Sequence, residues 1–231
     1  MNSLSFFVAM LISLATLTFC NLKGFFTMRV IMKIVSSFLF LCIAYAAKKE
    51  NEHIVSKKYF NLIFLGLFFA FWGDTFLVLA EGHGILLILG VLCFMLTHIF
   101  YTYAYLQHGA FTKSDVLYAI CFFVPLLCLS LLPYFDFRGL KPVVYIYGII
   151  ISTMAGKSLS LRKFKKENPY FVSCTIAASL LMLISDALLL FAIFGGSSYW
   201  YMSAVNNVLY YIGQGLYGLS FRKRNPSALV P

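Results

Sequence analysis

The stretch that decides the fold is residues 59–80, YFNLIFLGLFFAFWGDTFLVLA, a largely apolar run with one carboxylate, Asp74, inside it. About 20 apolar residues are enough for a helix to cross the hydrocarbon core of a membrane. A charged side chain near the bilayer centre costs at least about 3 kcal/mol, so Asp74 is a functional hypothesis by default. The apolar run at 170–194 carries a second carboxylate, Asp186, and the local sequences are similar: GDTFL at 73–77 and SDALL at 185–189. Two such carboxylates predict a site inside a membrane protein.

The composition excludes a soluble globule. Of the 231 residues, 61% are hydrophobic and only 11% are charged, and the mean hydropathy is +0.88. A soluble domain has roughly 25% charged residues, so this chain has too little polar surface to face water. The net charge of +10 does not indicate nucleic-acid binding. The basic residues lie in loops between apolar segments, where they set topology and contact anionic lipids.

The predicted fold class is all-α, a polytopic membrane bundle of eight transmembrane helices. Glycine and proline clusters separate the apolar segments. The predicted helices are Leu4–Leu22, Met28–Ala47, Tyr59–Ala80, Ile85–Leu106, Val116–Pro133, Pro142–Leu161, Tyr170–Phe194 and Trp200–Phe221. They form one domain, residues 1–224. Residues 225–231 are expected to be a tail that includes a tag remnant, and the first helix, which lacks a signal-peptide cleavage site, is expected to be retained.

The lysine and arginine residues predict the orientation, because cytoplasmic loops carry an excess of positive charge. With eight spans, the two termini and the even-numbered loops share one side of the membrane. That side holds twelve basic residues and the other side four, with Lys33 and Lys157 inside helices. Both termini are therefore predicted to be cytoplasmic. The recurrence of the aspartate motif four helices apart, in the same direction, also raises a four-plus-four internal repeat as a prediction.

Polar groups from several helices are predicted to share one layer. At a rise of 1.5 Å per residue, Asp74 and Asp186 both lie about 22–24 Å above the cytoplasmic edge of the membrane core. Lys33, Tyr147 and Asn206 reach the same depth on helices that run the other way. Helical spacing also predicts polar stripes, which must face other helices or a water-filled cavity. These stripes are Lys33, Ser36 and Ser37 on the second segment, His98, Tyr101 and Tyr105 on the fourth, and Asn206, Tyr210, Gln214 and Tyr217 on the eighth.

Each of these residues has a structural and a functional interpretation. The aspartates can pair with Lys33 or a tyrosine merely to fix helix register. Alternatively, two carboxyls in a low-dielectric cavity cannot easily both ionise, so the pair can supply an acid and a base. Lys33, near Arg29, can extend its ammonium to the interface or bind a phosphate. His98 can be a hydrogen-bonded core residue or a catalytic group, and the stripe from Asn206 to Gln214 can join helices or contact a substrate.

Several site types are absent from the sequence. The six cysteines lie in apolar segments without a C-x-x-C pair or a histidine at metal spacing, so no metal and no disulfide is predicted. No G-x-S-x-G, H-E-x-x-H or phosphate-loop motif is present. An intramembrane aspartyl protease would be expected to show Gly-x-Gly-Asp, whereas residues 71–74 are FWGD.

At these residues the chain resembles the YhhN-like lysoplasmalogenase family of integral membrane proteins. The matching motifs occur in order along nearly the whole chain. They are Met32-Lys33, FWGDTFL at 71–77, Gly90 with THIFY at 97–101, VYIY at 144–147 with Met154, ISDALL at 184–189 and YYIGQ at 210–214. The chain departs from the family pattern at Ile34, where proline is usual, and at Gly213, where alanine is common.

The resemblance implies a membrane hydrolase that cleaves the vinyl-ether bond of lysoplasmalogens, giving a fatty aldehyde and a glycerophospho-headgroup. Asp74 and Asp186 would be the catalytic pair, and no cofactor is expected. The predicted substrate-binding residues are Lys33, His98, Tyr101, Tyr147, Asn206, Tyr210 and Gln214. The expected partners are a lysophospholipid and membrane lipids, not nucleic acid. The protein is expected in the inner membrane of a bacterium or the endoplasmic reticulum of a eukaryote. A proton-coupled lipid or small-molecule transporter that uses the same aspartates, and a receptor or structural bundle, remain alternatives.

Overall fold

The computed structural model describes residues 2–51, 56–80, 84–137, 139–195 and 200–222. In this part of the chain the structure is all-α, as predicted, with eight long helices and no strand. The predicted tail at 225–231 lies outside the described residues. The helices are α1 Ser3–Lys23, α2 Phe26–Glu50, α3 Lys57–Leu79, α4 Gly84–Leu106, α5 Lys113–Ser130, α6 Lys141–Leu159, α7 Pro169–Phe194 and α8 Trp200–Leu219, and a short 3-10 helix, η1 Ser160–Phe164, follows α6.

Every helix begins and ends within three residues of its predicted bounds. The side chains of Asn2, Ser56 and Thr112 cap α1, α3 and α5 by accepting backbone N–H groups of the first turn. Proline is found in the first turn of α6 and of α7, where its missing N–H group costs nothing. Gly24 ends α1 with a left-handed φ of 72°, a conformation that glycine adopts without strain.

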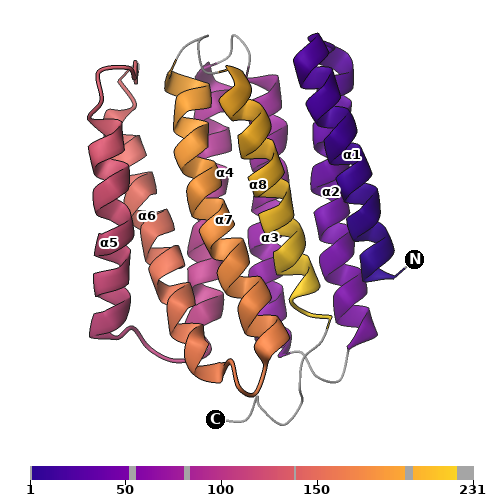
Figure 1. Ribbon diagram of the computed structural model, residues 1–231, viewed down its shortest axis with the longest axis vertical. Helices are drawn as coiled ribbons and strands as arrows, with labels where there is room; N and C mark the ends of the chain where they lie inside the picture. The colour runs from indigo at the N-terminus through magenta and orange to yellow at the C-terminus, as the bar shows by residue number, and fades with distance from the viewer. Residues whose placement is uncertain (1, 52–55, 81–83, 138, 196–199, 223–231) are drawn as a thin grey trace.

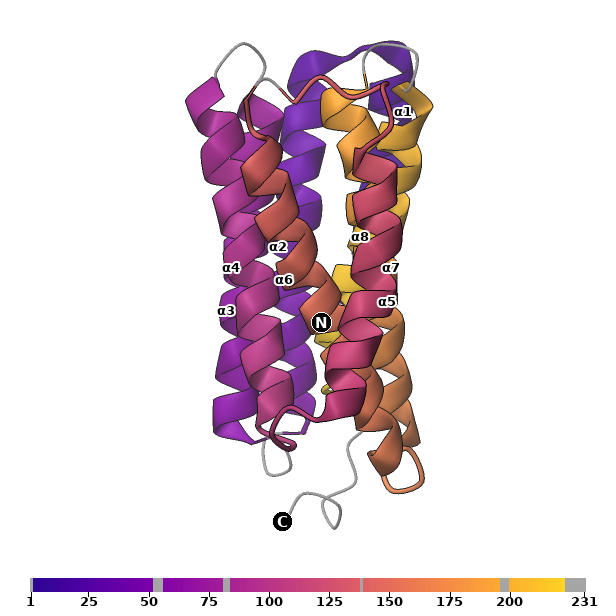
Figure 2. The same ribbon diagram turned by 90° about the vertical axis from the view of Figure 1, so that its left-hand side faces the viewer.

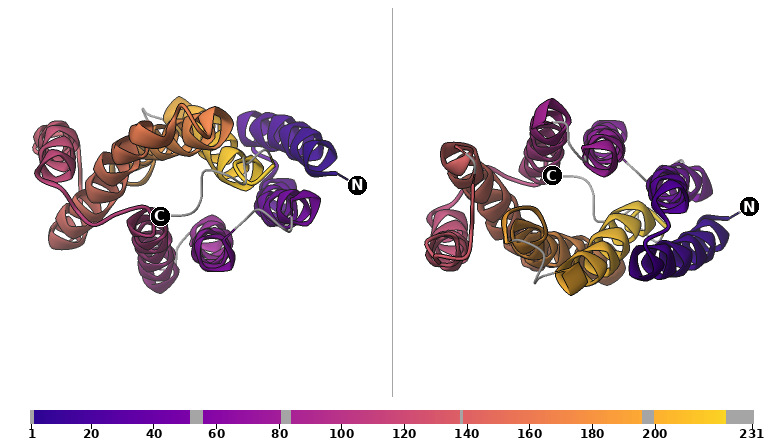
Figure 3. Two further views of the ribbon diagram at one scale, coloured as in Figure 1. Left: turned by 90° about the horizontal axis from the view of Figure 1, so that it is seen from below. Right: turned by 90° about the horizontal axis from the view of Figure 1, so that it is seen from above.

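The helices run alternately up and down, so that α1 begins and α8 ends at the lower end of the bundle in Figure 1. Helices that are consecutive in the chain pack as antiparallel pairs, α1 with α2, α3 with α4, α5 with α6 and α7 with α8. Between these pairs, α2 packs against α3 and α8, and α6 packs against α4 and α7. Figures 2 and 3 show that the bundle is elongated in cross-section, with α5 at one edge and α1 at the other.

Seven of these helices, α1 to α7, are long and apolar enough to cross a membrane. The eighth helix, α8, has 20 residues but is less apolar than a membrane-spanning helix needs to be. The predicted number of helices is therefore confirmed, and seven of the eight also have the composition of a membrane span. The physical reason lies in the face that α8 turns into the bundle. Asn206, Asn207 and Gln214 are buried there, beside three buried tyrosines. Since these polar groups face other helices, α8 needs few apolar residues on that side.

Glycines allow α3 and α4 to approach closely beside the first carboxylate. A Cβ atom added to Gly73 would lie 2.9 Å from the ring of Phe94 on α4. A Cβ atom added to Gly90 would lie 2.9 Å from Leu77 Cγ on α3. Both gaps are too short for real carbon atoms, so the two helices fit together only because these positions are glycine. The packing fixes the backbone on which Asp74 is carried.

Candidate functional site

Asp74 lies on α3 and is almost fully buried, with 2% of its surface exposed. Ser37 Oγ on α2 donates a hydrogen bond to its Oδ2 atom at 2.6 Å, and the Tyr211 hydroxyl on α8 donates to the same atom at 3.4 Å. The Lys33 ammonium, one turn before Ser37, lies 3.5 Å from Asp74 Oδ1. Three donors, one of them a cation, therefore surround this carboxylate.

Asp186 lies on α7 and is held by a different set of side chains. The Tyr147 hydroxyl on α6 donates to its Oδ2 atom at 2.6 Å, and His98 Nε2 on α4 lies 2.9 Å from the same atom. His98 Nε2 and the Tyr147 hydroxyl are 3.0 Å apart, so the three groups form a closed triangle. Among the described residues, no lysine or arginine pairs with Asp186, and no hydrogen bond or ion pair joins it to Asp74.

A cavity of about 350 Å³ lies at the upper end of the bundle, beside Lys33, the ion-pair partner of Asp74. It is called the basic cavity here because Arg29 and Lys33 of α2 line it, with Asn21, Ser203 and Asn207 as further polar groups. Apolar side chains form the rest of its wall, mainly from α1, α3, α4 and α7. Lys33 therefore reaches both Asp74 and this cavity. Two cations on one wall suit an anionic ligand such as a phosphate.

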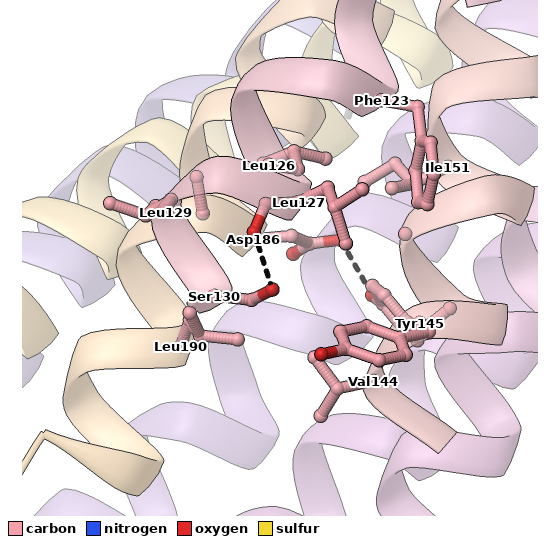
Figure 4. A pocket seen from close by; sticks show the side chains of 13 residues that line it. Phe123, Leu126, Leu127, Leu129, Ser130, Val144, Tyr145, Ile151, Asp186 and Leu190 are labelled. Atoms are coloured by element: carbon pink, nitrogen blue, oxygen red, sulfur yellow. Dashed lines mark hydrogen bonds between the residues drawn. The ribbon is translucent and has the colours of Figure 1, made fainter. Parts of the chain in front are cut away.

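Asp186 lines two smaller and mainly apolar pockets. The α5 pocket, about 40 Å³, lies between α5, α6 and α7, and Figure 4 shows the Asp186 carboxyl in it among leucines of α5. The α4 pocket, about 60 Å³, lies between α4, α6 and α7. Leu189 and Ile193 line both the α4 pocket and the basic cavity. The α4 pocket, which contains Asp186, and the basic cavity therefore share these two side chains in their walls.

The polar residues of α8 lie at three levels of the bundle. Near Asp186, Asn206 Nδ2 donates to the Ser185 carbonyl oxygen at 2.6 Å. At the next level, the Tyr210 hydroxyl donates to the Ala70 carbonyl oxygen at 3.4 Å and also interacts with Asp74. Lower still, the Tyr101 hydroxyl donates to Gln214 Oε1 at 2.6 Å. Asn206, Tyr101 and Gln214 therefore join helices, and their predicted contact with a substrate stays a prediction.

The lower half of the bundle is closed by a further group of buried hydroxyls. The Tyr105 hydroxyl lies 2.8 Å from Ser179 Oγ and 2.9 Å from the Tyr217 hydroxyl, and the Tyr101 and Tyr217 rings are 4.2 Å apart. All three tyrosines are fully buried. These contacts tie α4, α7 and α8 together below the carboxylates.

Ser37 and Tyr211, which both contact Asp74, were not among the predicted site residues. Ser37 shares a helix face with Lys33 at a spacing of four residues, and this spacing was a usable signal. Tyr211 follows Tyr210 directly, and no periodicity in α8 tells which of the two rings meets Asp74.

A buried ion pair lies apart from both aspartates, at the lower end of the bundle. It joins Lys157 on α6 to Asp115 on α5, with an Nζ–Oδ2 distance of 3.0 Å.

Comparison with known families then decides where the chain belongs. The model of the YhhN family matches residues 28–221, which contain α2 to α8 and both aspartates. The chain belongs to the YhhN family. Comparisons with curated proteins and with solved structures gave no match. The suspected family is thereby confirmed, and the charged and apolar cavities described above are features of a YhhN-family bundle. Among the described residues, no cluster of histidine, cysteine or carboxylate side chains could hold a metal ion.

Proposed function

We propose that this chain is a membrane hydrolase that cleaves the vinyl-ether bond of lysoplasmalogens. The observation that carries the proposal is that a cavity lined by two cations shares the wall residues Leu189 and Ile193 with an apolar pocket that contains a carboxyl group, Asp186. A lysophospholipid has the matching shape, since an anionic phosphate is followed by an alkyl chain. The resemblance to the lysoplasmalogenase family gives the same substrate class.

In the proposed binding mode, Arg29 and Lys33 hold the phosphate in the basic cavity. The alkenyl chain passes Leu189 and Ile193 into the α4 pocket, which brings its ether end close to Asp186. Charge-assisted hydrogen bonds to phosphate fix orientation as well as adding affinity. The apolar pocket walls exclude bulk water around the reacting bond.

The reaction needs an acid and a base but no electron transfer. A carboxylic acid gives its proton to the alkene carbon farther from the ether oxygen, and the π electrons form the new C–H bond. The resulting oxocarbenium ion is captured by water, which loses a proton to a carboxylate. The hemiacetal then breaks its C–O bond to the glycerol, giving a fatty aldehyde and a free hydroxyl. One water is consumed in total, and Asp74 and Asp186 are the two carboxyls that we assign to these steps.

The decisive experiment uses the purified full-length chain in detergent with a lysoplasmalogen and its saturated alkyl-ether analogue. We expect fatty aldehyde from the first lipid and none from the second, because only an alkene can be protonated to an oxocarbenium ion. The reaction in D2O, with the aldehyde trapped by reduction, should place one deuterium on the carbon next to the carbonyl carbon. Absence of aldehyde from the lysoplasmalogen would overturn the proposal.

A further inference from the structure

The two carboxylates differ in what their oxygens contact. At Asp186, His98 Nε2 and the Tyr147 hydroxyl both contact Oδ2, at 2.9 and 2.6 Å. Its Oδ1 atom accepts no hydrogen bond from any other described residue, and Asp186 lines the α5 and α4 pockets. At Asp74, both oxygens are occupied, Oδ1 by Lys33 and Oδ2 by Ser37 and Tyr211. Only Asp186 therefore has a free oxygen atom beside an apolar pocket.

His98 shows which way the hydrogen bond to Asp186 runs. His98 is fully buried, and its Nδ1 atom has no hydrogen-bond partner among the described residues. A buried N–H group without an acceptor costs about 1–3 kcal/mol, so a proton on Nε2 is the better satisfied arrangement. His98 then donates Nε2–H to Asp186 Oδ2. Both contacts at Oδ2 are donated to the carboxyl group, and the carboxyl's own proton can only be on Oδ1.

We propose that Asp186 is the proton donor of the reaction, through its Oδ1 atom, and that His98 and Tyr147 are its positioning residues. This inference rests on the proposed function. Before the step, Oδ2 is the carbonyl oxygen of a carboxylic acid and accepts from both donors. The Oδ1–H bond then breaks as the alkene carbon takes the proton, and the negative charge that develops on Asp186 is stabilised by the same two donors. Preorganised donors at a developing charge are an efficient source of transition-state stabilisation.

The surroundings of Asp186 give this assignment a kinetic test. His98 Nε2 on α4 and the Tyr147 hydroxyl on α6 contact its Oδ2 atom, while α5 presents leucines and Ser130. If His98 or Tyr147 loses its donor, the negative charge that develops on Asp186 is less well stabilised, so kcat should fall while KM changes little.

The experiment compares His98→Gln and Tyr147→Phe with a matched control, Tyr145→Phe. Tyr145 lies two residues from Tyr147 on α6 and lines the α5 pocket, but it makes no hydrogen bond to Asp186. Removing one donor of this kind typically lowers kcat by about 10²-fold. We expect losses of that order in kcat in the first two variants, with KM nearly unchanged. Tyr145→Phe should show no such loss.

Tyr147→Phe removes one oxygen atom and keeps the ring, so it tests the inference even if His98→Gln fails to fold. If the wild-type chain cleaves lysoplasmalogen but Tyr147→Phe has the kcat and KM of Tyr145→Phe, this assignment is wrong and the proposed function stands. Residual cleavage by Asp186→Asn that greatly exceeds that by Asp74→Asn would also overturn it. If the wild-type chain releases no aldehyde, both the function and the assignment fall.

Discussion

Asp74 and Asp186 occupy equivalent positions in the two halves of the bundle. Asp74 on α3 is bonded to side chains from α2 and α8, and Asp186 on α7 is bonded to side chains from α6 and α4. Helices four apart in the chain correspond: α3 to α7, α2 to α6 and α8 to α4. The same correspondence converts the packing of α2 on α3 and α8 into that of α6 on α7 and α4. The four-plus-four repeat stays a prediction, because α1 also packs on α8 while the corresponding helices α5 and α4 do not pack comparably in the described part of the chain.

The symmetry has a consequence for the proposed chemistry. Each half supplies one carboxylate with its own partners, a lysine and two hydroxyls for Asp74 and a histidine and a tyrosine for Asp186. Equivalent positions with different partners can give two carboxyls opposite tasks. The proposed chemistry does not require the two carboxylates to be in contact. In the proposed binding mode the substrate extends from the basic cavity, beside Asp74, to the α4 pocket, beside Asp186.

The first prediction concerns the aspartates themselves. Asp74→Asn and Asp186→Asn keep the side-chain shape and remove the charge and the titrating proton. General acid–base catalysis is typically worth about 10²–10⁴-fold, so each variant should lose about that factor in kcat in the aldehyde assay. The losses in the double variant should not add, because the residues act as one unit. Near wild-type rates in both well-folded single variants would show that the carboxylates are structural.

A second prediction concerns the basic cavity. Lys33→Met removes a cation that lines the cavity and leaves Asp74 without its ion pair. A hydrogen bond to a charged group contributes about 1.5–3 kcal/mol, so KM for lysoplasmalogen should rise about tenfold or more, and more than kcat falls. Lys141→Gln is the control, because Lys141 is an exposed lysine at the same end of the bundle that does not line the cavity. An unchanged KM in Lys33→Met would mean that the ammonium binds no phosphate.

The fold could be predicted from the sequence because lipid imposes a strong constraint on it. Each membrane-spanning helix must satisfy its own backbone hydrogen bonds and present about 20 mostly apolar residues, which makes segments such as Lys57–Leu79 visible in the sequence. The depth argument likewise placed Lys33 and Asp74 in one layer, and the structure has them 3.5 Å apart. Rise per residue fixes depth, so residues at one depth on neighbouring helices can meet.

The partners of each carboxylate could not be predicted in this way. Helical periodicity gives the face of a helix but not the neighbour that the face meets. The contact of Asp186 with His98 depends on α4 and α7 both lying beside α6, and the contact of Asp74 with Tyr211 depends on α8 lying beside α2. The Asp115–Lys157 pair likewise depends on the pairing of α5 with α6. Helix adjacency is the information that a single sequence lacks.

That ion pair gives the third prediction. Asp115 and Lys157 are both buried, and the Lys157 ammonium also donates to the Ala110 carbonyl oxygen at 2.7 Å. Lys157→Met leaves an uncompensated carboxylate and should cost about 3–5 kcal/mol in the free energy of unfolding. Thermal unfolding in detergent would measure the loss. Adding Asp115→Asn should restore part of the stability because it removes the unpaired charge, and no recovery in the double variant would contradict this account.

The fourth prediction concerns the close packing of α5 on α6. A Cβ atom added to Gly156 would lie 2.7 Å from the Ala119 backbone nitrogen, and backbone atoms cannot move aside cheaply. Gly156→Ala should therefore destabilise the protein by about 1–3 kcal/mol, as overpacking typically does. Gly148→Ala on the same helix is the control, since its nearest neighbour is a side-chain atom of Phe123 at 3.3 Å. Equal melting temperatures for the two variants would contradict the predicted clash.

The last prediction concerns orientation in the membrane. Lys48, Lys57, Lys113 and Arg162 lie at the lower end of the bundle, where α1 begins and α8 ends, whereas Arg29 and Lys141 lie at the upper end. Because positive charge is retained in the cytoplasm, the lower end should be cytoplasmic and the basic cavity should face the opposite side. A reporter that is active only in the cytoplasm, fused after Arg224, should be active, and the same reporter fused after Gly24 should be silent. The reverse result would invert the bundle and place the basic cavity, and the phosphate that we assign to it, on the cytoplasmic side.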